Sequence, residues 1–205
     1  MTHDPVSEDQ RPDAASTMRQ TGPVDRQAIR DEMRQRRDTL YALLRSLSVD
    51  ELKRPSYGTR WNHEELLFHM VFGYIVVVVL TSILTLLGRL PRPATRPFAA
   101  LLNAFTRPFN AMNYLASRLG AKVFNHRRMG ATFERVCASL CGKLDRASEA
   151  SLQRGMYYPT RWDPFFKEYM TLADLFRYPT RHFDFHLQQL ARPTSPAAQT
   201  ASTPT

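Results

Sequence analysis

The chain has 205 residues, a formal net charge of +9 and only eight glycines. This length suffices for one sizeable hydrophobic core without a second domain. The chain has no alternating β-branched runs separated by turn signals, which favours an all-α fold, and we predict one. The positive charge comes mostly from arginines scattered along the chain, not from a basic stripe with interleaved aromatic residues, so no nucleic-acid partner is expected.

The two ends of the chain differ in composition from its middle. Residues 1–23 are polar and lack apolar periodicity, and residues 192–205 are rich in Pro, Ser, Thr and Ala. Both segments are predicted to be disordered tails. A single folded unit is therefore expected over residues 24–191, beginning with a helix from about Asp25 to Leu47 whose apolar residues recur at helical spacing.

The second predicted helix begins at Asn62, because Asn62 followed by Glu65 three residues later matches a capping box. It ends at Gly88, which is followed by prolines. Within it, residues 70–87 carry no charge and reach the length of a candidate membrane span. A helix buried all round in a bundle has the same composition, and several polar residues interrupt the run, so we favour a core helix.

Further helices are predicted towards the C-terminus. One or two short helices are expected between Pro97 and Gly120, interrupted near Pro108, and a long helix from Lys122 to about Ala150. A last helix, capped by Thr171, is expected to reach about Leu190 and to kink at Pro179.

The two cysteines, Cys137 and Cys141, lie four residues apart in one predicted helix. Side chains on adjacent turns are poorly placed for a disulfide, so we interpret both as buried thiols. Reduced cysteines, together with the lack of a secretory signal in the N-terminal residues, predict a cytoplasmic protein.

Three of the six histidines are candidate metal ligands. His182 and His186 share one face of the last predicted helix, and His69 lies on the apolar second helix. An isolated histidine pair, or one histidine on an apolar face, is more often part of a core, whereas three imidazoles from two helices match a catalytic zinc site with an open position. Imidazole also suits nickel and iron. His63 and His126 lie beside charged residues and are expected to face solvent.

Two stretches carry a family resemblance. "RWNHEELLFHM" resembles the second helix of the DinB-like metalloproteins, in which a Trp and a Glu-Leu-Leu run precede a ligand histidine. "TLADLFRYPTRHFDFHLQQL" resembles their last helix, in which a Thr-Leu start leads to a His-x-x-x-His pair. The resemblance implies a four-helix bundle in which His69, His182 and His186 bind a divalent metal. Relative to the usual pattern, this chain has an extra helical insertion between the second and third main helices.

The family includes bacillithiol and mycothiol transferases and maleylpyruvate isomerases. The resemblance therefore implies a metal-dependent transferase or hydrolase that acts on a low-molecular-weight thiol or another small molecule. The alternative is a non-enzymatic helical module that associates with a membrane or a partner through its long apolar helix. Whether the protein is a monomer or a homodimer stays open.

Other residues are candidates for the surroundings of the metal. Glu65 lies one turn before His69 and could accept a hydrogen bond from an imidazole, or it could only cap the helix. Aromatic residues in the loops before the ligand helices could line a pocket or plug the ends of the bundle. These aromatic residues are Tyr57, Tyr157, Tyr158 and Trp162.

Arg60 and Arg161 recur in the similar stretches "GTRWN" and "PTRWD", which precede the two ligand helices. The repetition suggests equivalent turns at the start of each helix, or arginines that bind an anionic substrate. We favour equivalent turns.

Overall fold

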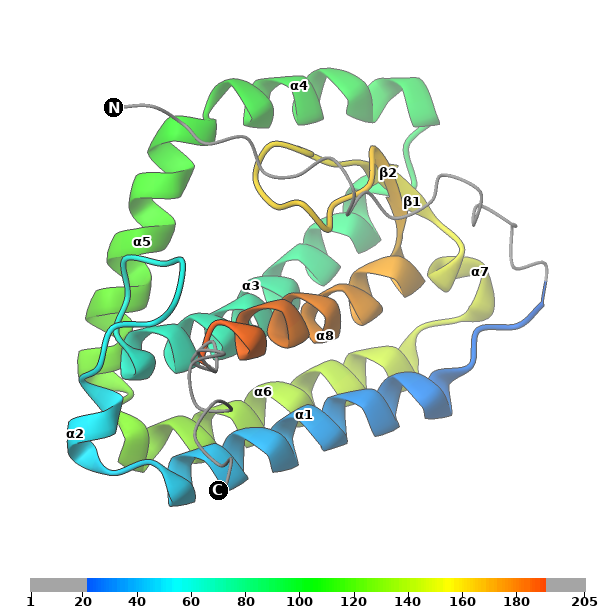
Figure 1. Ribbon diagram of the computed structural model, residues 1–205. Helices are drawn as coiled ribbons and strands as arrows, with labels where there is room; N and C mark the ends of the chain where they lie inside the picture. Colours follow the sequence, from blue (N-terminus) through cyan, green and yellow to red (C-terminus); the bar gives the residue numbers. More distant parts are fainter. Residues whose placement is uncertain (1–21, 191–205) are drawn as a thin grey trace, which may run out of the picture.

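The computed structural model describes residues 22–190, and four helices form its bundle (Figure 1). These are α1 (Arg26–Ser46), α3 (His63–Leu87), α6 (His126–Arg146) and α8 (Leu172–Gln188). α1 packs beside α6 and is antiparallel to it, and α3 packs beside α8 and is also antiparallel to it (Figure 1). The predicted all-α fold is confirmed. Residues 1–21 and 192–205 of the two expected tails lie outside the described residues.

A helical insertion joins α3 to α6, as expected. It consists of the short helix η3 (Arg92–Thr95), α4 (Arg96–Ala104) and α5 (Thr106–Val123). α4 lies across the top of the molecule in Figure 1, and α5 descends from it along one side of the bundle. The interruption between the two helices falls at Phe105, three residues before the proline that suggested it.

The expected helix from Lys122 to Ala150 is divided differently in the structure. Lys122 belongs to the last turn of α5. α6 begins only at His126, because the Asn125 side chain accepts a hydrogen bond from the backbone of Arg127 and caps the helix. Ala147 is extended and ends α6, and a separate four-residue helix, α7 (Glu149–Leu152), follows.

The two halves of the bundle repeat one local pattern. α1 is followed by the short helix α2 (Val49–Leu52), which Ser48 caps, just as Ser148 caps α7 after α6. The next long helix then begins with a capping box, made by Asn62 and Glu65 in α3 and by Thr171 and Asp174 in α8. These caps satisfy backbone N–H groups that a helix start leaves without partners.

The connections before α3 and α8 differ between the halves. A hairpin of β1 (Gly155–Tyr157) and β2 (Tyr169–Thr171) precedes α8, and the loop between its strands folds back under α4 (Figure 1). α8 continues through Pro179 and places that proline in the core. The Pro179 ring leaves the carbonyl of Leu175 without its helical N–H partner.

The core where α3, α6 and α8 meet is aromatic. Tyr74, Phe133 and Phe183 are fully buried, and the rings of Tyr74 and Phe133 pack edge to face with centroids 4.7 Å apart. Such pairs stabilise beyond their area burial. At the edge of this core, Arg36 of α1 makes two hydrogen bonds to the Asp184 carboxylate of α8 and ties the two helix pairs together.

α3 is not buried all round, contrary to expectation. Among residues 22–190 it is the one helix whose length and apolar composition would let it cross a membrane, and 39% of its most apolar 18 residues are buried. Val79 and Leu86 are 56% and 68% exposed. The reason is that α5 packs against the beginning of α3 and then diverges, so the second half of α3 has fewer neighbours.

Candidate metal centre

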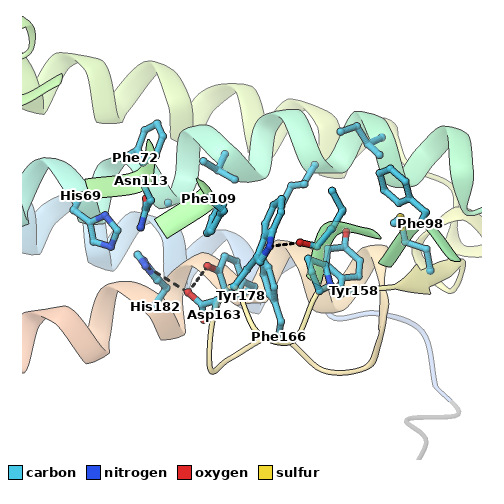
Figure 2. A pocket seen from close by; sticks show the side chains of 18 residues that line it. His69, Phe72, Phe98, Phe109, Asn113, Tyr158, Asp163, Phe166, Tyr178 and His182 are labelled. Atoms are coloured by element: carbon cyan, nitrogen blue, oxygen red, sulfur yellow. Dashed lines mark hydrogen bonds and ion pairs between the residues drawn. The ribbon is translucent and has the colours of Figure 1, made fainter. Parts of the chain in front are cut away.

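The structure places the three predicted histidines together. His69 projects from α3, and His182 and His186 project from facing positions one turn apart on α8. One ring nitrogen of each lies within 4.8 Å of the others, and the ring centroids are 4.5–4.9 Å apart. Figure 2 shows His69 and His182 pointing toward each other across the antiparallel α3–α8 pair.

Hydrogen bonds at the outer nitrogens orient two of these rings. Ser117 of α5 donates its hydroxyl to the carbonyl of Asn113, so its oxygen accepts from Nδ1–H of His69 at 3.0 Å. His186 donates from Nδ1 to the side-chain oxygen of Gln189 at 2.7 Å. In this tautomer the Nε2 lone pairs of both rings are free to bind a cation, as in histidine metal sites whose second nitrogen is held by an acceptor.

His182 is buried against α3, next to Gly73. Its Nδ1 is buried without a hydrogen-bond partner among residues 22–190. Its Nε2 lies 3.7 Å from a carboxylate oxygen of Asp163. A buried polar nitrogen without a partner costs free energy, which a metal ion at the cluster would offset if it bound a nitrogen of this ring. The donor set therefore fits a divalent ion.

The three imidazoles are neutral at physiological pH. Burial lowers the pKa of His182 to about 3, with His186 adding to the effect. Burial, followed by the neighbouring His182 and His186, lowers the pKa of His69 well below its usual value. Burial also lowers the pKa of His186. Since a metal needs the unprotonated ring, protons compete weakly with an ion at this cluster.

Trp61 covers the cluster at the start of α3. Its ring stacks on His69 with centroids 4.3 Å apart and meets His186 edge-on at 6.3 Å. The tryptophan thus lies against histidines from both ligand helices and restricts their ring positions.

Asp163 is a candidate functional residue that the sequence analysis missed. It accepts a 2.8 Å hydrogen bond from the Tyr178 hydroxyl (Figure 2). It accepts another from the backbone N–H of Phe165. Burial raises the pKa of its carboxyl, and these two hydrogen bonds oppose that change. Asp163 lies in a loop 19 residues before His182, and the only signal for it was its place directly after Trp162 in the repeated motif.

A cavity adjoins His69 and His182, with about 870 Å³ of empty space including its open mouth. Figure 2 shows side chains from α3, α4, α5, the 158–166 loop and α8 around it. Most of these side chains are aliphatic or aromatic, and no lysine or arginine is among the described residues that line it. Near the histidines, its polar groups are those of Asn113, Asp163 and Tyr178.

Two of the four aromatic residues in the loops before the ligand helices line this cavity, as one of the two alternatives for these residues predicted. Trp162 lines it, stacks on Phe109 with centroids 3.9 Å apart and donates its indole N–H to the carbonyl of Leu102. Tyr158 also lines it. In contrast, Tyr57 is 66% exposed and contributes no side chain to the lining, and Tyr157 packs against Tyr169 of the hairpin.

Glu65 caps its helix and does not contact an imidazole. One carboxylate oxygen accepts from the backbone of Asn62, and the other pairs with Arg118 of α5 at 3.2 Å. The capping interpretation therefore fits, and Ser117, not Glu65, holds His69. The carboxylate is drawn to the helix start by the free N–H groups there.

The two arginines of the repeated stretches, Arg60 and Arg161, lie outside the cavity. The Arg60 guanidinium stacks over the ring of Tyr114, and Arg161 is exposed. The turns are also not equivalent, because Asn62 caps α3 directly whereas Asp163 lies before β2 and faces the histidines. The two histidines expected in solvent, His63 and His126, are partly buried, and His126 bonds to Glu64.

Comparison with known proteins agrees with this arrangement. The sequence model of the DinB superfamily matches residues 32–190, which include most of α1, the whole of α3, α6 and α8, and all three histidines. No curated protein and no solved structure matches the chain at a significant level. The chain belongs to the DinB superfamily.

Proposed function

We propose that His69, His182 and His186 bind one divalent metal ion and that the protein is an enzyme using this ion on a small molecule in the adjoining cavity. The observation that carries the proposal is the buried, neutral three-imidazole cluster at the cavity wall. Zinc, nickel and iron all suit imidazole ligands. A metal would supply Lewis acidity, lowering the pKa of a water or thiol or polarising a carbonyl.

The protein's own groups support such chemistry. Asp163 lies beside His182 and the cavity, where its carboxylate can orient that ring or accept a proton from a substrate. Tyr178 holds the carboxylate through its hydroxyl. The neighbouring apolar wall lowers the local polarity, which strengthens electrostatic interactions at this position.

The lining of the cavity bears on the substrate. A thiol transferase or a hydrolase remains the proposed reaction class. Among the described residues the lining offers one carboxylate and no side-chain cation, so the positive charge in this cavity would be that of the proposed metal ion. Burying a charge away from that ion is costly, so the apolar lining favours a substrate whose remaining part is neutral and largely apolar.

Metal binding is tested by elemental analysis and titration of the purified full chain. We expect one equivalent of metal in the wild type and strongly reduced affinity in His69→Ala, His182→Ala and His186→Ala. His63→Ala serves as the matched control, since this histidine lies outside the cluster. Full occupancy in all three cluster variants would refute the site.

Catalysis is tested separately, on metal-loaded protein. The assay combines low-molecular-weight thiols with an apolar electrophile, and includes an apolar activated ester to detect hydrolysis. Turnover should require the metal and should fall in Asp163→Asn. An electrophile with a neutral apolar tail should be used in preference to an analogue that carries a carboxylate at the end of that tail. Stoichiometric metal without metal-dependent turnover across this panel would count against the enzyme and leave metal binding intact.

A further inference from the structure

The middle of the chain carries positive charge only. Between Glu65 and Glu134 there is no acidic residue, although the stretch contains all of α4 and α5. Its basic residues are Arg89, Arg92, Arg96, Arg107, Arg118, Lys122, Arg127 and Arg128. A one-sign run of this length is a physical indication of an anionic partner.

α5 exposes an apolar stripe beside these charges. Met112, Leu115, Leu119 and Val123 are 61%, 52%, 51% and 56% exposed and recur at spacings of three and four residues, so they share one side of the helix. Large apolar side chains gathered on one exposed helix face indicate an interaction surface.

The cations of α5 lie along one border of that stripe. Arg107, Arg118 and Lys122 are separated by eleven and four residues, which places them on one side of the helix, adjacent to the side of Leu115 and Leu119. Arg107 and Lys122 make no ion pair within residues 22–190, and Arg118 is exposed although it pairs with Glu65. The helix therefore presents an apolar face flanked by cations.

α4 continues the exposed apolar surface. Leu101 and Phe105, at its C-terminal end, are 55% and 54% exposed. α4 and α5 meet at Phe105 and lie on the outside of the bundle in Figure 1.

The opposite faces of both helices are held by the protein. Phe98 and Leu102 of α4 and Phe109 of α5 line the cavity. Farther along α5, Gly120 packs so closely on α3 that a Cβ there would lie 2.0 Å from the ring of Phe68. The inner faces of α4 and α5 are therefore already packed against the rest of the protein, and the exposed apolar residues lie on the opposite faces.

We propose that the outer face of α4 and α5 docks on the surface of an anionic lipid bilayer. Apolar side chains flanked by Lys and Arg suit the boundary between headgroups and acyl chains, where they bury area and meet anionic headgroups. A second copy of the chain fits less well, because two such faces would bring cations against cations. This inference goes beyond the proposed reaction and does not depend on the metal.

The charge contribution is tested by sedimentation of the full chain with vesicles. The vesicles contain phosphatidylcholine alone or with about one third phosphatidylglycerol. We expect binding to the anionic vesicles only, weakened as salt rises from about 0.1 M to 1 M. Arg107→Gln/Lys122→Gln should lower the partition coefficient about 30-fold, since each cation near such a surface contributes on the order of fivefold.

The matched control removes the same charge elsewhere. Arg45→Gln/Lys53→Gln alters two exposed cations near the α1–α2 end of the bundle and should change partitioning by no more than about twofold. Equal losses in the two double variants, or equal binding to both kinds of vesicle, would overturn the proposal.

The apolar contribution is tested with Leu115→Gln/Leu119→Gln, whose side chains are exposed and whose circular dichroism should match wild type. Anionic-vesicle binding should fall about tenfold or more, while Val49→Gln, at an exposed apolar residue of α2, should leave it unchanged. Sedimentation velocity without lipid tests whether a second copy of the chain binds this face instead of a bilayer. A wild-type dimer that this variant converts to monomer, with vesicle binding unaffected, would overturn the proposal and assign the face to self-association.

Discussion

Gly73 of α3 lies directly against His182, and its replacement by alanine tests the histidine cluster without touching a ligand. A Cβ at Gly73 would lie 2.8 Å from Nδ1 and 3.1 Å from Cε1 of His182. Nonbonded heavy atoms rest at about 3.5 Å or more. The ring must therefore move by roughly 0.7 Å, which exceeds the ~0.5 Å tolerance within which a functional site must be held.

Two effects compete in Gly73→Ala. Alanine within a helix is favoured over glycine by about 1 kcal/mol, whereas the contact displaces a buried ring that has little room to move. We expect metal affinity to fall about 10- to 100-fold, as when groups that orient a ligand are altered. Stability of the metal-free protein should change little, because the helix gain offsets part of the steric cost.

Gly142→Ala in α6 is the matched control. Its Cβ would meet only the flexible end of Arg146, at 3.3 Å, far from the cluster. This variant should raise the melting temperature by about 2–4 °C and leave metal affinity unchanged. Affinity is measured by competition with a chromophoric chelator, and stability by thermal unfolding after metal removal. Wild-type metal affinity in Gly73→Ala would refute the assignment of His182 to the site.

Three further outcomes are expected. Metal-free protein should lose about 2 kcal/mol of unfolding free energy between pH 7.5 and 5 through His182 alone, because the unfolded chain takes up a proton below about pH 6.5 and the folded imidazole does not until about pH 3. Urea titrations should show a smaller loss in His182→Gln. An equal pH dependence in the wild type and this variant would contradict the prediction. Phe133→Ala, in the core away from the histidines, should lower the free energy of unfolding by about 3–5 kcal/mol in denaturant titrations, while the folded fraction still binds one metal. A loss of metal binding without a loss of stability would contradict the assignment of Phe133 to the core alone. Asp163→Asn should weaken metal binding by about tenfold in chelator competition, while the exposed Glu168→Gln should leave it unchanged. An unchanged affinity in Asp163→Asn would show that Asp163 does not support the metal ligand His182.

The starts of the two ligand helices could be predicted because they depend on interactions within a few residues. Asn62 with Glu65, and Thr171, cap α3 and α8 at the predicted positions. The four-residue spacing of His182 and His186 likewise determines that they share a helix face. His69 was joined to them by family resemblance, since nothing in local spacing relates α3 to α8.

The boundary between α5 and α6 was misplaced for a similar local reason. Apolar periodicity runs on across residues 122–125, while the break depends on Asn125 capping α6 and on Phe124 stacking against Phe68 of α3. The stacking contact joins residues 56 positions apart in the sequence. Periodicity alone therefore extended the helix too far.

The composition of α3 indicated a buried helix, but composition does not state which neighbours cover it. Only the path of α5 decides that Val79 and Leu86 are exposed while the first half of α3 is enclosed. In the same way, whether Glu65 bonds to a histidine or to Arg118 depends on where α5 docks. Short-range caps and helical periods are encoded in neighbouring residues, so the sequence by itself determined the starts of α3 and α8 and the histidine pair of α8. The approach of Asp163 to His182, the bonds from Ser117 and the closed wall of the cavity arise from packing between distant segments, and only the tertiary structure decided them.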